Sequence, residues 1–266
     1  MSRAFMNLAI VLAALLATTA AGAADPGARE IMERNFLASK IRSLRVDTTM
    51  SLVTARHETR ERRTTVLMKL QPNGVDSKLL VRFHAPADIK GTAFLQIEHI
   101  DGEDDQWVYL PALKRSRRLV ANNKKDSFVG SDFSYGDISL PKVDLYKHSL
   151  LRSEVADQAD CFVVESVPAT DEVKANSGYS RKVTWIRKDT FIEAKVEYYD
   201  LSARLLKVQK TADHQPVQAN PARWFPRYRE MANHQTGHKT LIRVNAIESG
   251  VAAPDDQFTT RFLERE

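Results

Sequence analysis

Along most of the chain, hydrophobic and polar residues alternate with a period of two. Between residues 45 and 52, the more apolar side chains occupy the even positions and the polar ones the odd positions. The same alternation recurs around residues 66–70, 79–83, 183–185, 194–198, 206–208 and 242–246. Successive side chains of a strand point to opposite faces, so this pattern predicts half-buried strands in an antiparallel meander. We expect roughly 10 to 12 strands, which is close to the size at which an open sheet curls.

Residues 25–39 depart from this period and predict a short helix. Ile31, Phe36 and Leu37 can share one helix face, and Asp25 with Pro26 can start the helix. Shorter helices are expected in loops around residues 86–90 and 131–139. A curled sheet with one apolar face needs something to fill its concavity. With only one substantial helix, part of that surface should stay unfilled, and such cavities are common sites for small molecules.

The N-terminus has the pattern of a cleavable signal peptide. Arg3 precedes a continuous apolar run at residues 8–17, and Ala21-Gly22-Ala23 forms a small-x-small cleavage site. We therefore expect residues 1–23 to be removed and residues 24–266 to form a single domain in the periplasm. The one cysteine, Cys161, is far from the cleavage site, so a lipid anchor is not expected.

The chain is basic, with a formal net charge of +5. A basic chain of this size raises the question of nucleic acid. Export from the cytoplasm argues against that partner. Anionic lipid head groups or an acidic membrane partner agree better with the charge and the location.

Residues 86–137 are rich in aromatic and loop-forming residues and poor in groups that do catalysis. Three strings stand out: KGTAFLQIE at 90–98, DDQWVYLPALKRSRRL at 104–119 and SFVGSDFSYGD at 127–137. These strings resemble the LolA-like family of periplasmic outer-membrane lipoprotein-sorting proteins. The resemblance implies an α+β fold in which a mainly antiparallel sheet forms an open half-barrel around a hydrophobic cavity. The N-terminal helix and the short loop helices would partly close it.

The same resemblance implies a carrier that shelters acyl chains. Its implied partners are a lipid or lipidated cargo and a large inner-membrane exporter of the RND type, with the carrier itself a monomer. The aromatic and aliphatic residues expected to line the cavity are Phe94, Leu95, Trp107, Tyr109, Phe128, Phe133 and Tyr135. Trp107 and Tyr109 share one strand face, which is either the cavity wall or ordinary core. Residues 127–137 are either a flap with Gly130 and Gly136 as flexible points or a plug at one end of the barrel.

A dense basic cluster surrounds one predicted hairpin. It comprises Lys114, Arg115, Arg117, Arg118, Lys124 and Lys125. The cluster either docks an acidic partner or a lipid head group, or protects an exposed sheet edge from strand-to-strand pairing. We call these residues the basic cluster.

Motifs of common enzymes do not appear in the sequence. It contains no G-x-S-x-G, H-E-x-x-H, P-loop or G-x-G-x-x-G motif. His234 and His238 are four residues apart, but Asn233 and Gly237 predict a turn and not a zinc-binding helix. We therefore expect no catalytic residues, no metal and no cofactor. A carrier of acyl chains between the membranes is the leading hypothesis, and an envelope adaptor with a filled core is the alternative.

Overall fold

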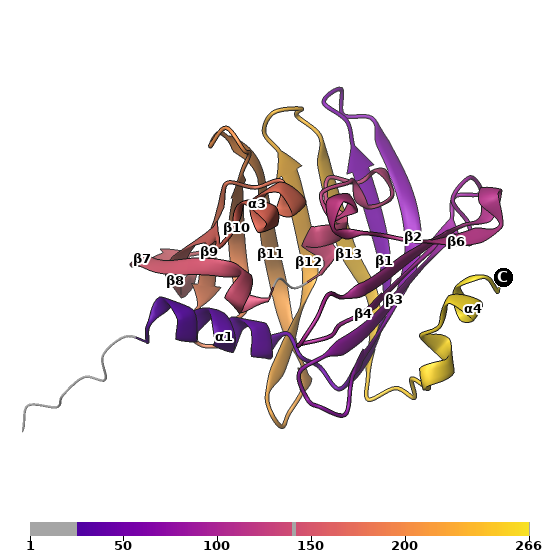
Figure 1. Ribbon diagram of the computed structural model, residues 1–266, viewed down its shortest axis with the longest axis horizontal. Helices are drawn as coiled ribbons and strands as arrows, with labels where there is room; N and C mark the ends of the chain where they lie inside the picture. The colour runs from indigo at the N-terminus through magenta and orange to yellow at the C-terminus, as the bar shows by residue number, and fades with distance from the viewer. Residues whose placement is uncertain (1–25, 140–141, 266) are drawn as a thin grey trace, which may run out of the picture.

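The structure is a computed structural model, and it describes residues 26–139 and 142–265. All thirteen strands of the described residues join one antiparallel sheet in the order β6-β5-β4-β3-β2-β1-β13-β12-β11-β10-β9-β8-β7. The sheet curls into an open half-barrel (Figure 1). The predicted architecture is confirmed, with slightly more strands than expected. The predicted signal peptide lies outside the described residues.

The strand order shows how the chain builds the half-barrel. Strands β1 to β6 meander outward in one direction, and β7 to β13 meander back until β13 pairs with β1. The strands of the outward meander are β1 (Ser43–Val53), β2 (Thr59–Leu70), β3 (Ser77–Ala85), β4 (Ala93–Ile97), β5 (Asp105–Leu110) and β6 (Arg115–Arg118). Those of the return meander are β7 (Tyr146–Ala156), β8 (Ala159–Pro168), β9 (Arg181–Arg187), β10 (Glu193–Tyr199), β11 (Leu205–Gln218), β12 (Arg223–Asn233) and β13 (Lys239–Ser249).

Irregular pairing accompanies the curl of the sheet. The register of β1 and β13 shifts between Asp47 and Thr48, and that of β10 and β9 shifts between Glu193 and Lys195. Such bulges bend a strand and increase its twist. The two end strands, β6 and β7, do not pair with each other, so the barrel stays half open.

Helix α1 (Ala28–Ala38) lies across one end of the half-barrel (Figure 1). Its buried Ile31 packs with Phe162, Val164 and Ile186 of the return meander. The Asn35 side chain donates a hydrogen bond of 2.9 Å to the carbonyl of Phe191. This confirms a helix where the period changed. None of the helices in the described ranges is long and apolar enough to cross a membrane.

The remaining helices are short. They are α2 (Tyr135–Ile138), α3 (Asp171–Ser177) and α4 (Thr260–Leu263), with 3-10 turns at Pro111–Leu113, Ala121–Asn123, Phe128–Gly130, Val143–Leu145 and Asp255–Gln257. Ser134 caps α2: its hydroxyl accepts from the Asp137 amide, and the Asp137 carboxylate accepts from the Ser134 amide. This reciprocal pair is a capping box, which stabilises even a single helical turn.

The connection between β6 and β7 fills one end of the concavity with aromatic rings. Phe128, Phe133 and Tyr135 are all buried there. The Phe128 ring meets those of Phe94 and Tyr135 edge-on, each at 5.5 Å between centroids. Edge-to-face packing is a favoured arrangement for aromatic pairs. In this structure the segment 127–137 is therefore packed as a plug.

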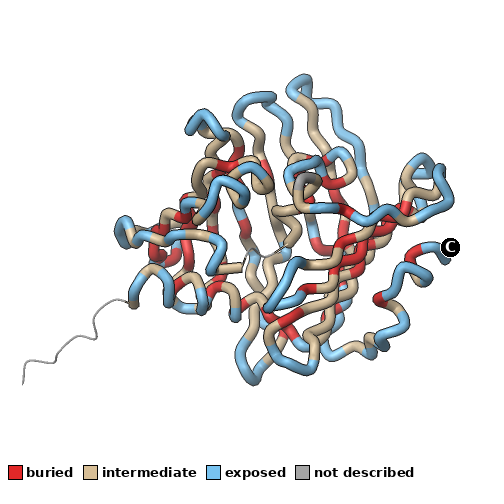
Figure 2. The backbone as a smooth tube through the Cα atoms, viewed as in Figure 1, coloured by how far each residue is buried: buried red, intermediate tan, exposed pale blue. Residues whose placement is uncertain are grey.

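The C-terminal segment covers part of the outer face of the sheet. Phe258 and Leu263 are buried against Leu80, Leu95 and Tyr109. Arg82 donates hydrogen bonds to the carbonyls of Phe262 and Arg265 at the end of α4. Buried residues gather along this part of the sheet (Figure 2).

Candidate functional site

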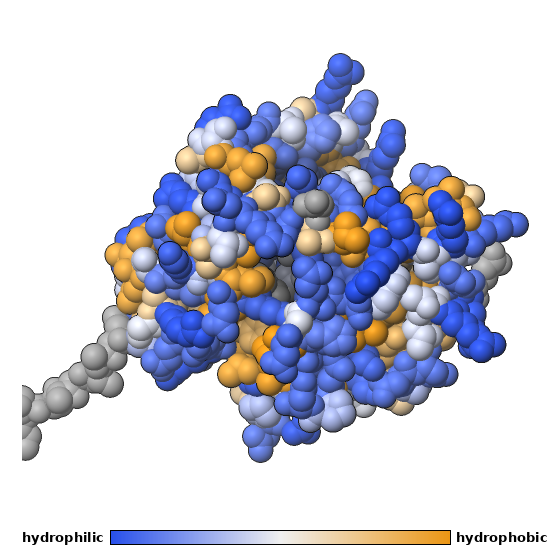
Figure 3. Space-filling model, viewed as in Figure 1, coloured by the Kyte–Doolittle hydropathy of each residue, from blue (hydrophilic) through white to orange (hydrophobic). Residues whose placement is uncertain are grey.

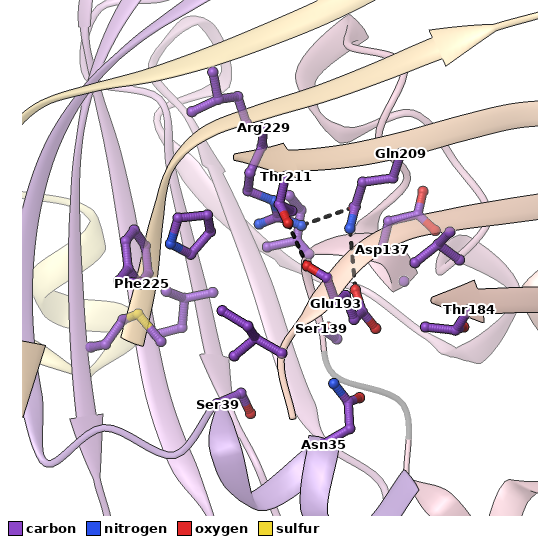
Figure 4. A pocket seen from close by; sticks show the side chains of 18 of the residues that line it. Asn35, Ser39, Asp137, Ser139, Thr184, Glu193, Gln209, Thr211, Phe225 and Arg229 are labelled. Carbon is purple, nitrogen blue, oxygen red and sulfur yellow. Dashed lines mark hydrogen bonds between the residues drawn. The ribbon is translucent and has the colours of Figure 1, made fainter. Parts of the chain in front are cut away.

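A cavity of about 280 Å³ occupies the part of the concavity that the aromatic plug leaves open. The concave face of the sheet forms its floor, and α1 and the segment after α2 contribute to its rim (Figure 4). The volume is near the lower end of the roughly 300–1,000 Å³ found for small-molecule sites.

One wall of the cavity is apolar and belongs to β13, β1, β2 and β3. It presents Val46, Met50, Val66, Leu79 and Ile242, among other residues. Its polar members, Thr48 and Thr64, hydrogen-bond to each other at 2.6 Å and are satisfied. This side offers a guest only hydrophobic contact. We call it the apolar wall.

The opposite side, on β7 to β12, is polar. Arg229 donates a 3.0 Å hydrogen bond to the Gln209 side-chain oxygen, and Gln209 donates one of 3.2 Å to the Glu193 carboxylate (Figure 4). Burial raises the pKa of Glu193, although Arg229 acts to lower it. The residues occupy three neighbouring strands and therefore form a continuous polar surface.

A buried ion pair adjoins this surface. Lys207 Nζ lies 2.6 Å from the Asp137 carboxylate, and both side chains are almost inaccessible. Tyr179 donates to the same carboxylate at 2.9 Å, and the Ser134 amide donates at 2.7 Å. Burial alone would raise the pKa of Asp137, but Lys207 and Lys182 outweigh it and the pKa is lowered. Asp137 is thus an ionised, fully satisfied carboxylate.

Five polar residues lie side by side across the return meander. In cross-strand register they are His148, Ser166, Lys182, Tyr198 and Lys207, one from each strand from β7 to β11. All except Lys207 line the cavity. We call this set the polar row. Since period-two alternation places residues of one register on one face, the row follows from the strand pairing itself.

The two histidines that line the cavity are uncharged. Burial lowers the pKa of His148 and of His214, so both imidazoles are neutral near pH 7. No group of three or more potential metal ligands occurs in the part of the chain that the structure describes. An apolar wall facing a polar one suits an amphiphilic guest.

The residues expected to line the cavity fall into two groups. Phe128 lines it. Phe94, Phe133 and Tyr135 belong to the same buried cluster as Phe128 and form the plug, not the cavity surface.

Leu95, Trp107 and Tyr109 lie on the other face of the sheet. They pack against the C-terminal segment in a cluster with Leu263. The expectation that Trp107 and Tyr109 line the concave wall is therefore corrected. The alternation correctly placed both on one face, but it does not reveal which face is concave.

The basic cluster lies at the open edge of the sheet and in the connection that follows it. Four of its residues belong to the β5–β6 hairpin and are exposed: Lys114, Arg115, Arg117 and Arg118. The Arg118 guanidinium forms an ion pair of 2.5 Å with the Asp105 carboxylate. Lys125 is exposed, whereas Lys124 is half-buried. The structure thus brings most of the cluster together on one edge. Hydrophobic residues on the face seen in Figure 3 gather only in small groups among hydrophilic ones.

The polar side of the cavity could not be recognised from the sequence. Lys182 and Gln209 lie in strands that the alternation identified, but both looked like exposed polar residues, and the strand that carries Arg229 was not identified. Gln209 is buried, but it stands between Val208 and Lys210 in the sequence, so nothing local distinguishes it from an exposed residue. Inward-pointing polar residues of a strand are indistinguishable from outward-pointing ones until the curvature is known.

Several known proteins share this architecture. A family model described as an uncharacterized protein matches residues 75–265. A domain assigned to outer membrane lipoprotein sorting from Vibrio parahaemolyticus is 33% identical, with 90% of this chain and 98% of that chain covered and a TM-score of 0.81. A DUF1329 family protein from Desulfovibrio piger is 28% identical, with coverage of 89% and 97% and a TM-score of 0.80.

A LolA superfamily protein from Nitrosomonas europaea is 22% identical over 89% of this chain and 99% of its own, with a TM-score of 0.67, and supports the fold. No curated protein matches. The half-barrel with a partly open concavity places the chain in the class of lipoprotein-sorting folds. It belongs to the LolA-like family of outer-membrane lipoprotein-sorting proteins.

Proposed function

We propose that this protein is a non-enzymatic periplasmic carrier that holds the acyl chains of a lipid or lipoprotein in its cavity. The observation that carries the proposal is the apolar wall, because its own side chains leave about 280 Å³ beside it unfilled. Apolar burial gains about 0.8 kcal/mol per CH₂ group. An acyl chain lying along Val66, Leu79 and Ile242 would gain that energy without any covalent step.

The need to release the cargo limits how tightly such a site should bind it. A carrier must give up its cargo, so the hydrophobic gain has to be modest or adjustable. The half-barrel agrees with this requirement, since its two end strands, β6 and β7, do not pair with each other and the barrel is not closed. The carrier would then shuttle its cargo between the inner and outer membranes as a monomer.

Location and partner complete the proposal. The signal-peptide pattern of residues 1–23 supports export to the periplasm, with residues 24–266 as the mature domain. The basic cluster is the proposed docking surface for an acidic face of an inner-membrane exporter of the RND type, or for anionic lipid head groups. Its position at a sheet edge supports docking there as well as protection of the edge.

Native mass spectrometry of the purified mature protein, followed by lipid extraction, tests the carrier function. We expect bound acyl-containing molecules in the parent protein. Val66→Trp should reduce their occupancy, because the indole fills space beside the apolar wall. The matched control is Val155→Trp on the exposed edge strand β7, where Val155 is 69% exposed. A parent protein that carries and takes up no lipid would favour the envelope adaptor with a filled core.

A further inference from the structure

We propose that the cavity selects acyl ligands ending in one compact anionic group, a carboxylate or a phosphate, and that Lys182 binds that group. This inference rests on the proposed carrier function and adds the chemical class of the ligand. It starts from the polar row, because most of its members already have partners and one cation does not.

The outer members of the row are satisfied within the protein. His148 Nδ1 and the Ser166 hydroxyl hydrogen-bond at 2.8 Å, and His148 Nε2 lies 3.0 Å from the Val143 carbonyl. Lys207 donates to Asp137 at 2.6 Å and to the Asp132 carbonyl at 2.9 Å. These groups therefore already have hydrogen-bond partners within the protein.

Lys182, at the centre of the row, differs. Among residues 26–139 and 142–265, no carboxylate oxygen lies within 4.0 Å of its Nζ, and no residue accepts a hydrogen bond from it. The ammonium is instead surrounded by the rings of Tyr146, Tyr179 and Tyr198, with Nζ at 5.2, 5.4 and 5.5 Å from their centroids. Ring faces attract a cation but accept no strong hydrogen bond. Lys182 therefore keeps its three donors available while it lines the cavity.

Nearby carboxylates do not cancel this charge. Asp137 is already neutralised by Lys207 and receives further hydrogen bonds from Tyr179 and the Ser134 amide. Glu193 accepts a hydrogen bond from Gln209, and burial raises its pKa. A second cation, Arg229, also faces the cavity and has no carboxylate within 4.0 Å in the described part of the chain. Two cations, Lys182 and Arg229, thus face the cavity without a carboxylate of the described residues within 4.0 Å.

The hydroxyl of Tyr198 adds a neutral donor next to Lys182. The two residues are cross-strand neighbours on β9 and β10. Burial raises the pKa of Tyr198 well above its ordinary value, so the phenol keeps its proton. An ammonium and a phenol side by side suit a carboxylate or phosphate oxygen. The apolar wall on the opposite side would take the attached acyl chain, which fixes the orientation of the guest.

The test compares three probes of one chain length: palmitate, 1-palmitoyl lysophosphatidate and methyl palmitate. Their dissociation constants are measured at pH 7.5 and low probe concentration for the mature protein, K182Q and K182R. The control is K210Q, since Lys210 is an exposed residue on β11. We expect the parent and K210Q to bind both anions at least about tenfold more tightly than the ester. K182Q should lose that preference with unchanged ester binding, and K182R should regain most of it.

The possible outcomes test separate parts of the proposal. A preference for only one of the two anions identifies the head group and supports the site. Equal binding of all three probes to the parent protein overturns the anion selection and leaves the carrier function standing. A preference that survives in K182Q overturns the role of Lys182. Binding of none of the probes overturns the carrier function itself, and the inference with it.

Discussion

Lys182 and Tyr198 are direct cross-strand neighbours on the inner face of the sheet, and the Lys182 ammonium lies 5.5 Å from the centre of the Tyr198 ring. The pairing puts a cation and a phenol at the middle of a polar row that faces a hydrophobic wall. A cavity with this division is suited to an amphiphile and poorly suited to a purely apolar guest, because a guest without polar atoms would leave the Lys182 ammonium without a hydrogen-bond partner.

The first prediction concerns Glu193. Burial raises its pKa above the ordinary 4.5, so the folded state binds a proton more tightly than the unfolded state does. Stability contributed by this group is present below pH 4.5 and is lost as the pH rises through the folded-state pKa. Glu193→Gln should therefore raise the free energy of unfolding at pH 8 and leave it nearly unchanged at pH 4. Urea titrations at both pH values measure this, and a variant less stable than the parent at pH 8 would contradict it.

Asp137→Asn should act in the opposite sense. The pKa of Asp137 is lowered below the ordinary 3.8 in the folded protein, so its stabilisation is present above pH 3.8 and lost as the pH falls through the folded value. Removing one partner of a buried ion pair typically costs about 3–5 kcal/mol. We expect such a loss at pH 7, shrinking on acidification below pH 4. Asp189→Asn is the control, since Asp189 pairs with Arg187 at an exposed site.

The C-terminal segment should stabilise the sheet without contributing to the cavity. Leu263 is fully buried against the outer face, where removal of a leucine side chain costs about 2–5 kcal/mol. Leu263→Ala should therefore lower the melting temperature and leave ligand affinity per folded molecule unchanged. Leu201→Ala, at a position 55% exposed, should change neither. Loss of affinity in a folded Leu263→Ala protein would show that the two faces are coupled.

Charge reversal in the basic cluster should separate docking from folding. The residues to change together to Glu are Lys114, Arg115 and Arg117, which are exposed. Exposed charges contribute little to stability, so the melting temperature should stay within a few degrees of the parent. Transfer of cargo, or capture of a membrane partner in a pull-down, should fall. Full transfer activity in a folded variant would leave the cluster only its edge-protecting role.

The general architecture could be predicted from the sequence because period-two alternation survives in a half-buried sheet. The outward-and-return strand order could not, since nothing local to β1 specifies that it pairs with β13, 186 to 205 residues further along the chain. The same limit explains the error over Trp107. Its alternation with Val108 fixed two faces correctly, and only the direction of curvature decides which of them is concave.

The site was harder to predict than the fold. The aromatic plug could be recognised as unusual, because Phe128, Phe133 and Tyr135 lie close together in a predicted loop. The polar row could not be predicted, because its members are far apart in sequence and are brought together only by the strand register. A lysine on a strand is therefore expected to be exposed to solvent, unless the curvature of the sheet is known to place it on the concave face.

Tryptophan fluorescence tests the central claim that the cavity binds acyl chains. Trp224 lines the cavity, whereas Trp107 lies in the cluster on the outer face. Two proteins are needed, each with one tryptophan: W107F/W185F, which keeps Trp224, and W185F/W224F, which keeps Trp107. An acyl chain that enters the cavity replaces water with hydrocarbon beside Trp224.

Titration of both proteins with palmitate should give a saturable blue shift of Trp224 emission and no change for Trp107. A response from Trp107 alone, or saturable binding that leaves Trp224 unchanged, would contradict a ligand site inside the half-barrel.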